Sequence, residues 1–225
     1  MAKAALVTGG SSGIGLAIAR MLRDEDYGVM LAARNPDRLA AAATELGAES
    51  VAANVADEDD CQRIVAEHRA RFERLDVLVN CAGVGVAGRI EDLETKHWDL
   101  QLNVNLRSAF LVTRFALPLL KQSHGIVVNL ASIAGTMPAP GLAAYGAAKA
   151  GLISLTQSLN AEHGGNGVRA TAICPGFVDT PMAAWTGMPS EEMIQPEDCA
   201  EVVRALLRLS PRARIPQVII ERLGT

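Results

Sequence analysis

The amino-acid sequence predicts an α/β protein in which helices cover both faces of one mainly parallel sheet of about seven strands. Short apolar runs alternate with helical stretches along the chain of 225 residues. The first apolar run leads directly into a glycine-rich turn and a helix, as at the start of an open parallel sheet. The chain is 49% hydrophobic but only 4% aromatic, which suits Ala-, Val- and Leu-rich helices packed on buried parallel strands.

In the first half of the chain, each expected strand is an apolar run bounded by turn residues. These strands are Lys3–Thr8, Tyr27–Ala33, Ser50–Ala53 and Leu75–Asn80. Of the three expected helices between them, the first is rich in Ala, Ile and Leu, the second begins with a proline, and the third begins with acidic residues. These helices are Gly15 to about Arg23, Pro36–Leu46 and Asp57–Phe72. A helix between successive strands favours parallel pairing.

The second half of the chain continues this alternation. Helical apolar spacing, a proline start and the Cys174-Pro-Gly stop mark most of its boundaries. The expected elements are helix Thr95–Leu120, strand Gly125–Leu130, helix Gly141–His163, strand Val168–Ile173, irregular loop Asp179–Gln195, helix Pro196–Leu209 and strand Gln217–Ile220. No repeat, linker or low-complexity block divides the chain, so residues 1–225 are expected to form one domain.

Charge and composition exclude several classes of function. A net charge of -4 provides no basic field for a nucleic-acid backbone or an anionic membrane surface. The four cysteines lack C-x-x-C spacing, which favours reduced thiols in a cytoplasmic protein. The four histidines are scattered, so no metal site is expected. No apolar run approaches the length of a membrane span, and no signal peptide is expected.

The turn after the first strand has the composition of a dinucleotide-binding loop. Glycines at 9, 13 and 15 would let the backbone approach a pyrophosphate at the start of the next helix. This spacing differs from the usual G-x-G-x-x-G, and a tight strand-to-helix connection alone would also explain it.

The end of the second expected strand bears on the choice of dinucleotide. An acidic residue there would bind the adenosine ribose of NAD, but the chain has Ala33-Arg34. The Arg34 guanidinium can instead pair with the 2′-phosphate of NADP, and Ser11 can add a hydroxyl. NADP is therefore favoured, and NAD is the alternative. Arg34 as an ordinary solvated cation would also fit this position.

Tyr145 and Lys149 are four residues apart in an expected helix, so their side chains project from one face. A nearby ammonium stabilises a tyrosine phenolate, as acid–base work near neutral pH requires. Ser132 follows the fifth expected strand at the edge where open α/β sheets bind ligands, and its hydroxyl can bind a substrate oxygen. A chance Tyr/Lys pair and an ordinary turn serine are the structural alternatives.

These motifs together resemble the short-chain dehydrogenase/reductase family. Thr8–Gly15, Asn105, Ser132, Tyr145–Lys149 and Pro175-Gly176 occur in the family's order and approximate spacing. The match extends from about residue 3 to residue 182, and the interval from Ser132 to Tyr145 is the one found in the family. The resemblance implies a Rossmann-type fold that transfers a hydride between a nicotinamide and a small carbonyl or alcohol substrate.

The resemblance also implies a role for each matching residue. Tyr145 would exchange a proton with the substrate oxygen, and Ser132 would orient and polarise that oxygen. Lys149 would bind the nicotinamide ribose and lower the tyrosine pKa, while Asn105 would interrupt its helix and hold a water in the proton relay. The expected cofactor-binding residues are Gly9, Ser11, Ser12, Gly13, Ile14, Gly15, Arg34, Asn54, Val55, Cys81, Ala82, Gly83, Tyr145, Lys149, Pro175, Gly176, Val178 and Thr180.

The chain departs from the family pattern at several positions. Cys81 replaces the second asparagine of Asn-Asn-Ala-Gly, so a sheet-stabilising hydrogen bond is expected to be missing. Cys81 is interpreted as a small buried filler because no positive group lies near it in the sequence. Asn54-Val55 replaces the usual Asp-Val beside the adenine, and asparagine keeps a hydrogen-bond acceptor there.

The expected substrate loop, at about 177–195, is shorter than is common in the family. Met182, Trp185 and Met188 would line a lid or simply pack this loop onto the domain. With residues 135–141 as the other wall, the pocket is predicted to be apolar and to take a small neutral carbonyl compound.

Two other functions are compatible with these motifs. A 3-oxoacyl-thioester reductase would need a basic docking patch for an acidic carrier protein, for which Arg107 and Arg114 are the candidates. A non-catalytic dinucleotide sensor would have little reason to keep all four catalytic-type side chains. The resemblance also implies a homodimer or homotetramer, paired through the helices that begin near Thr95 and Gly141.

Overall fold

The computed structural model describes residues 2–224, which contain a seven-stranded sheet in the order β3-β2-β1-β4-β5-β6-β7. Every neighbouring pair is parallel. The strands are β1 (Ala4–Thr8), β2 (Gly28–Ala33), β3 (Glu49–Ala52), β4 (Val77–Asn80), β5 (Ile126–Leu130), β6 (Arg169–Pro175) and β7 (Gln217–Ile220). The predicted fold class, a doubly wound parallel sheet, is confirmed.

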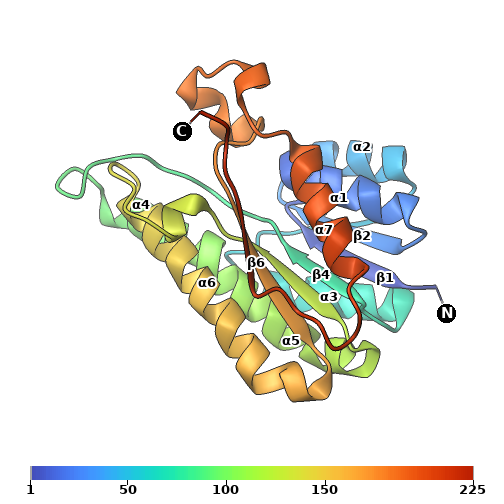
Figure 1. Cartoon of the computed structure of the whole chain (residues 1–225). Coiled ribbons are helices and arrows are strands. Elements are labelled where there is room, and N and C mark those ends of the chain that lie inside the picture. The colour runs from blue at the N-terminus through green and yellow to red at the C-terminus, as the bar shows by residue number, and fades with distance from the viewer. Residues whose placement is uncertain (1, 225) are drawn as a thin grey trace.

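Helices cover both faces of this sheet, as Figure 1 shows. On one face, α1 (Gly13–Asp24), α2 (Pro36–Leu46) and α7 (Pro196–Leu207) pack in one apolar cluster with the strands. On the other face, α3 (Glu58–Phe72) and α5 (Ser108–Ser123) form a second cluster. Alongside them lie α4 (Thr95–Leu102) and α6 (Ala143–His163), and none of the helices in residues 2–224 is long and apolar enough to cross a membrane.

The strand order reverses direction between β1 and β4, and this position determines where the site forms. The chain leaves β1 through the glycine turn and leaves β4 through residues 81–83. These two segments touch: a Cβ added at Gly9 would lie 2.8 Å from the backbone nitrogen of Ala82. Open α/β sheets bind ligands at such a reversal, beyond the carboxyl ends of the strands.

A buried polar network ties β4 and β5 together below this edge. Nδ2 of Asn80 donates to Oδ1 of Asn129 at 2.8 Å and to the Thr113 hydroxyl at 3.1 Å. Nδ2 of Asn129 donates to the Thr156 hydroxyl on α6 at 2.9 Å. Because buried polar groups are costly unless they are paired, this network favours one alignment of the strands that lead into the site.

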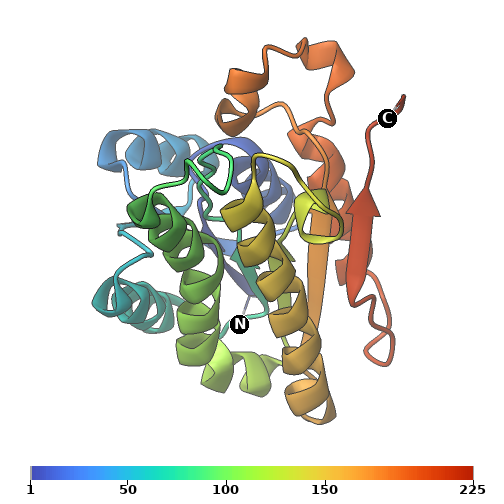
Figure 2. The same cartoon turned by 90° about the vertical axis from the view of Figure 1, so that its left-hand side faces the viewer.

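The structure changes several of the expected element boundaries, and three of these changes bear on the site. The helix expected over Thr95–Leu120 is broken by a π-helical segment, Asn103–Arg107, where the Ser108 N–H bonds the carbonyl five residues back. The expected strand Val168–Ile173 instead continues through Pro175, which pairs with Ile220 of the edge strand β7. The expected irregular loop contains two short 3-10 turns, and Figure 2 shows it as the orange segment above the sheet.

Candidate active site

A larger cavity of about 770 Å³ lies beyond the carboxyl ends of β1, β2 and β4. It brings together many of the expected cofactor residues, which come from five separate parts of the chain. Those that line it are Gly9, Ser11, Ser12, Gly13, Ile14, Arg34, Val55, Cys81, Ala82, Gly83 and Thr180.

The glycine turn fits a dinucleotide because side chains would close the space. Gly9 and Gly13 have φ angles of +69° and +54°, which disfavour residues with a Cβ. A Cβ at Gly13 would lie 2.9 Å from Cγ2 of Thr180. Ser12 precedes α1 without a side-chain cap, α1 has no acidic residue in its first turn, and Gly13 and Ile14 of that turn line the cavity. The start of α1 is therefore suited to bind an anion.

The charge of the larger cavity comes from two arginines, Arg34 and Arg38, which are its only charged lining residues among those described. Neither guanidinium forms an ion pair with any residue in 2–224. Sequence reasoning identified Arg34 but missed Arg38. The sequence signal that could have identified Arg38 is Asn35, a residue typical of a helix N-cap, which indicates that α2 begins directly after Arg34. In the structure the Asn35 side chain accepts a hydrogen bond from the Arg38 N–H, and Arg38 lies in the first turn of α2.

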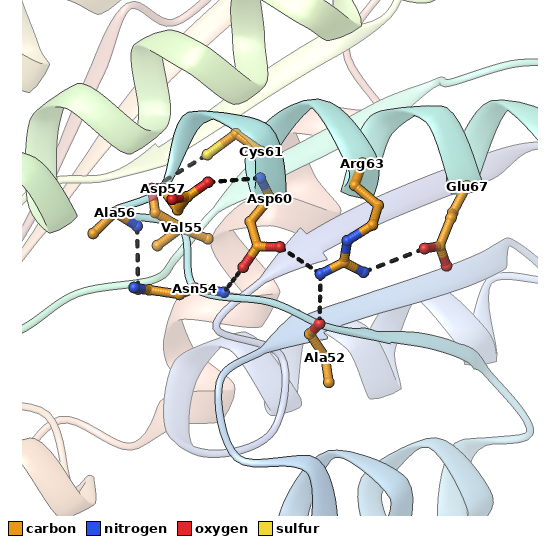
Figure 3. Close-up of polar contacts among 9 residues, drawn as sticks. All are labelled: Ala52, Asn54, Val55, Ala56, Asp57, Asp60, Cys61, Arg63 and Glu67. Atoms are coloured by element: carbon orange, nitrogen blue, oxygen red, sulfur yellow. Dashed lines mark hydrogen bonds and ion pairs between the residues drawn. The ribbon is translucent and has the colours of Figure 1, made fainter.

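Asn54 does not line the larger cavity, although Ala53 and Val55 on either side of it do. Its Oδ1 accepts from the Ala56 N–H at 3.3 Å, and its own N–H donates to Asp60 at 2.7 Å (Figure 3). Asn54 therefore shapes the turn that leads into α3. Gly15 is also absent from the lining: it is buried, and a Cβ there would lie 2.4 Å from the Gly9 carbonyl oxygen.

A smaller cavity of about 390 Å³ adjoins the larger one, and Ile14, Cys81, Gly83 and Thr180 line both. The smaller cavity brings together Ser132 after β5 with Tyr145 and Lys149 on α6. Its lining also includes the expected residues Pro175, Gly176 and Val178.

Burial shifts the pKa values of the two titratable side chains in opposite directions. Burial raises the pKa of Tyr145, and hydrogen bonding with Ser132 opposes this shift. Burial lowers the pKa of Lys149 to about 8. That Lys149 lowers the tyrosine pKa stays a prediction, since burial dominates the shift of Tyr145 in this structure. The ammonium lies over the tyrosine ring, 5.4 Å from its centre, and donates to the Leu130 carbonyl at 2.6 Å.

Asn105 lies in the π-helical segment and is buried. Its Nδ2 donates to the Val84 carbonyl at 2.8 Å, and its Oδ1 accepts from the Val84 N–H at 3.0 Å. A Cβ at Gly83 would lie 3.0 Å from Oδ1 of Asn105 and 3.9 Å from Nζ of Lys149. The expected interruption of the helix is confirmed, and Asn105 clamps the loop that separates it from Lys149.

The surroundings of Cys81 correct one sequence inference about it. The hydroxyl of Thr8 accepts from the backbone N–H groups of Cys81 and Ala82 at 3.2 and 3.3 Å, so it holds the end of β4 to β1. A positive group does approach Cys81, because folding brings Lys149 near it. Burial nevertheless raises the pKa of the Cys81 thiol to about 12, which keeps it protonated.

The geometry defines an oxidoreductase of the Rossmann type, and comparison with known proteins identifies its family. The model for short chain dehydrogenase matches residues 3–188. An uncharacterized oxidoreductase of Staphylococcus epidermidis is 38% identical over 97% of this chain and 96% of its own length. The chain therefore belongs to the short-chain dehydrogenase/reductase family and is an NAD(P)-dependent dehydrogenase or reductase.

Solved structures agree with this assignment. An alcohol dehydrogenase from the archaeon Thermococcus sibiricus, complexed with 5-hydroxy-NADP, has a TM-score of 0.93 and 30% identity, covering 100% of this chain and 98% of that one. A 3-ketoacyl-(acyl-carrier-protein) reductase from Brucella melitensis, complexed with NADH, has a TM-score of 0.89 and 27% identity, covering 97% of this chain and 96% of that one. These proteins are similar to this chain in fold along 97% or more of its length.

Proposed function

We propose that this protein is an NADPH-dependent reductase of small carbonyl compounds, which also runs in reverse as an alcohol dehydrogenase. The observation that carries the proposal is the pair of adjoining cavities. One has arginine as its only charged lining among the described residues, and the other contains Ser132, Tyr145 and Lys149. A 2′-phosphate would lie at Arg34 and Arg38, since no carboxylate of the described residues lines that cavity to accept from a free ribose hydroxyl.

The bound dinucleotide supplies the hydride that adds to the carbonyl carbon. Ser132 donates its hydroxyl hydrogen to the carbonyl oxygen and polarises it. Tyr145 then donates its proton to that oxygen. Because burial raises the tyrosine pKa, the hydroxyl is protonated at neutral pH and ready to act as the acid. Reduction therefore yields an alcohol and leaves a phenolate that solvent must reprotonate.

Lys149 retains donors for a second task. An ammonium has three hydrogens, and one is used at the Leu130 carbonyl, so two remain for the hydroxyls of the nicotinamide ribose. Its positive charge also stabilises the phenolate after proton transfer. Asn105 keeps the Val84 loop beside the lysine, with a water of the proton relay as its further proposed ligand.

The 3-oxoacyl-thioester alternative finds less support in the surface charges. Arg107 and Arg114, the candidate docking residues, both pair with Glu58 of α3, at 2.7 and 3.6 Å. The Glu58 carboxylate reduces the positive potential of the two arginines, which is the feature that would attract an acidic carrier protein. The sensor alternative leaves the proximity of Ser132, Tyr145 and Lys149 unexplained.

We also propose residues 177–195 as the substrate loop of a single domain, and a cytoplasmic homodimer or homotetramer as the working form. Trp98 and Leu100 on α4 and Phe110 on α5 are exposed apolar residues, which supports pairing that involves these helices.

The experiment that tests the function is NADPH consumption with a panel of small ketones by the wild type and by Tyr145→Phe. The proposal predicts turnover by the wild type and a loss of about 10²- to 10⁴-fold in kcat for the variant, because the acid is removed. NADPH binding should change little, which separates loss of chemistry from loss of fold. Turnover that survives in Tyr145→Phe would reject the assigned acid.

A further inference from the structure

The substrate end of the smaller cavity is almost free of charge. Among its described lining residues only Lys149 is ionisable as a cation, and none carries a carboxylate. Lys149 is buried, bound to the Leu130 carbonyl and assigned to the cofactor ribose. A carboxylate, phosphate or ammonium on the substrate would therefore enter this pocket without a partner, which is unfavourable.

One wall of this cavity carries two aromatic side chains that contact each other. Phe177, just after β6, and Trp185, in the 3-10 turn Pro181–Thr186, have ring centres 6.4 Å apart and ring planes at 73°. Both line the cavity, and they are 41% and 65% exposed. Apolar side chains this open gain stabilisation when a ligand covers them, and their edge-to-face pairing can accept a further ring.

A second segment of the cavity lining is apolar and adaptable. It consists of residues 137–140, of which Met137, Pro138 and Pro140 have no polar side-chain group other than a thioether. Met137 is 53% exposed, and methionine sulfur makes favourable contacts with the edges of aromatic rings. Ser132 and Tyr145 line the same cavity, so a flat ring bound in it can present an attached carbonyl group to both hydroxyls.

We propose that the substrate class is an uncharged aryl ketone, whose ring lies against the Phe177–Trp185 pair. The inference rests on the proposed carbonyl reduction and names its substrate. The dihydronicotinamide is oxidised as its hydride forms a C–H bond at the carbonyl carbon, and the ketone is reduced to a secondary alcohol as Tyr145 donates its proton to the oxygen. Phe177 and Trp185 determine specificity and take no part in the chemistry.

The test compares kcat/KM for acetophenone and 2-butanone in the wild type and in Trp185→Leu. Removing one aromatic contact should lower kcat/KM for acetophenone by about 3- to 10-fold while 2-butanone changes less than about 2-fold. Trp185→Phe should restore most of the acetophenone activity. Ile215→Ala is the control, because Ile215 is another exposed apolar residue, 40% exposed, and lines neither cavity.

Charge is tested with methyl benzoylformate and benzoylformate, which share the ring and the activated ketone but differ by one negative charge. The inference predicts that the ester is preferred by about 10²-fold or more, because the carboxylate has no partner. Equal use of the two compounds, or equal loss of both simple ketones in Trp185→Leu, would overturn the aryl-ketone inference and leave the reductase intact. If NADPH binds but no ketone is reduced, the proposed function itself fails and the inference falls with it.

Discussion

The choice of cofactor depends on two exposed arginines, and replacing them gives a quantitative prediction. Arg34 and Arg38 line the larger cavity without ion-pair partners among residues 2–224, so both guanidinium groups are free to bind a phosphate. A hydrogen bond to a charged group contributes about 1.5–3 kcal/mol, or roughly 10- to 150-fold in Kd. Because both side chains are exposed and screened by salt, we expect the lower end, about 10-fold for Arg34→Ala and for Arg38→Ala.

The assay is a fluorescence titration of NADPH and NADH against the wild type, the two single variants and the double variant. Affinity for NADPH should fall by up to about 100-fold in the double variant, and affinity for NADH should change less than about 2-fold. Arg20→Ala removes an exposed charge outside the larger cavity and serves as the control. Equal weakening of both dinucleotides, or no weakening of either, would refute the phosphate assignment.

Three further predictions concern stability and the site. Gly9→Ala should abolish dinucleotide binding, and in urea denaturation it should lower the free energy of unfolding more than the control Gly187→Ala does. Both glycines have positive φ, but only at Gly9 would the added Cβ lie within 3.0 Å of backbone atoms. Burial lowers the pKa of His68 to about 4 from 6.5, so the unfolded state binds more protons between these values. Stability should therefore fall as pH falls from about 6.5 to 4, by up to about 3 kcal/mol, and His68→Leu should weaken this dependence in urea titrations. Thr8→Val should raise the Kd for NADPH by removing the hydroxyl that holds Cys81 and Ala82, measured by fluorescence titration; an unchanged Kd would show that β4 needs no such anchor.

Much of the fold and the central part of the site could be predicted from sequence because their signals are local. The glycine turn follows an apolar strand directly, and Tyr145 and Lys149 share a helix face. The interruption at Asn105 left no such mark, since apolar spacing continues through the π-helical segment and only the family resemblance indicated it.

What sequence reasoning missed depends on contacts between distant segments. Arg38 reaches the larger cavity only because α2 begins at the Asn35 cap, directly after β2. Phe177 gains significance from its contact with Trp185 across the loop. The proximity of Lys149 to Cys81 arises from the tertiary fold and has no counterpart in sequence spacing.

The central claim is direct hydride transfer from a nicotinamide to a carbonyl carbon within the smaller cavity. The most direct test uses NADPH deuterated at the transferable position of the nicotinamide ring, with mass spectrometry of the alcohol formed from acetophenone. We predict one deuterium on the carbinol carbon with the wild type and almost no product with Tyr145→Phe. An alcohol without deuterium, or one formed equally by the variant, would contradict the account.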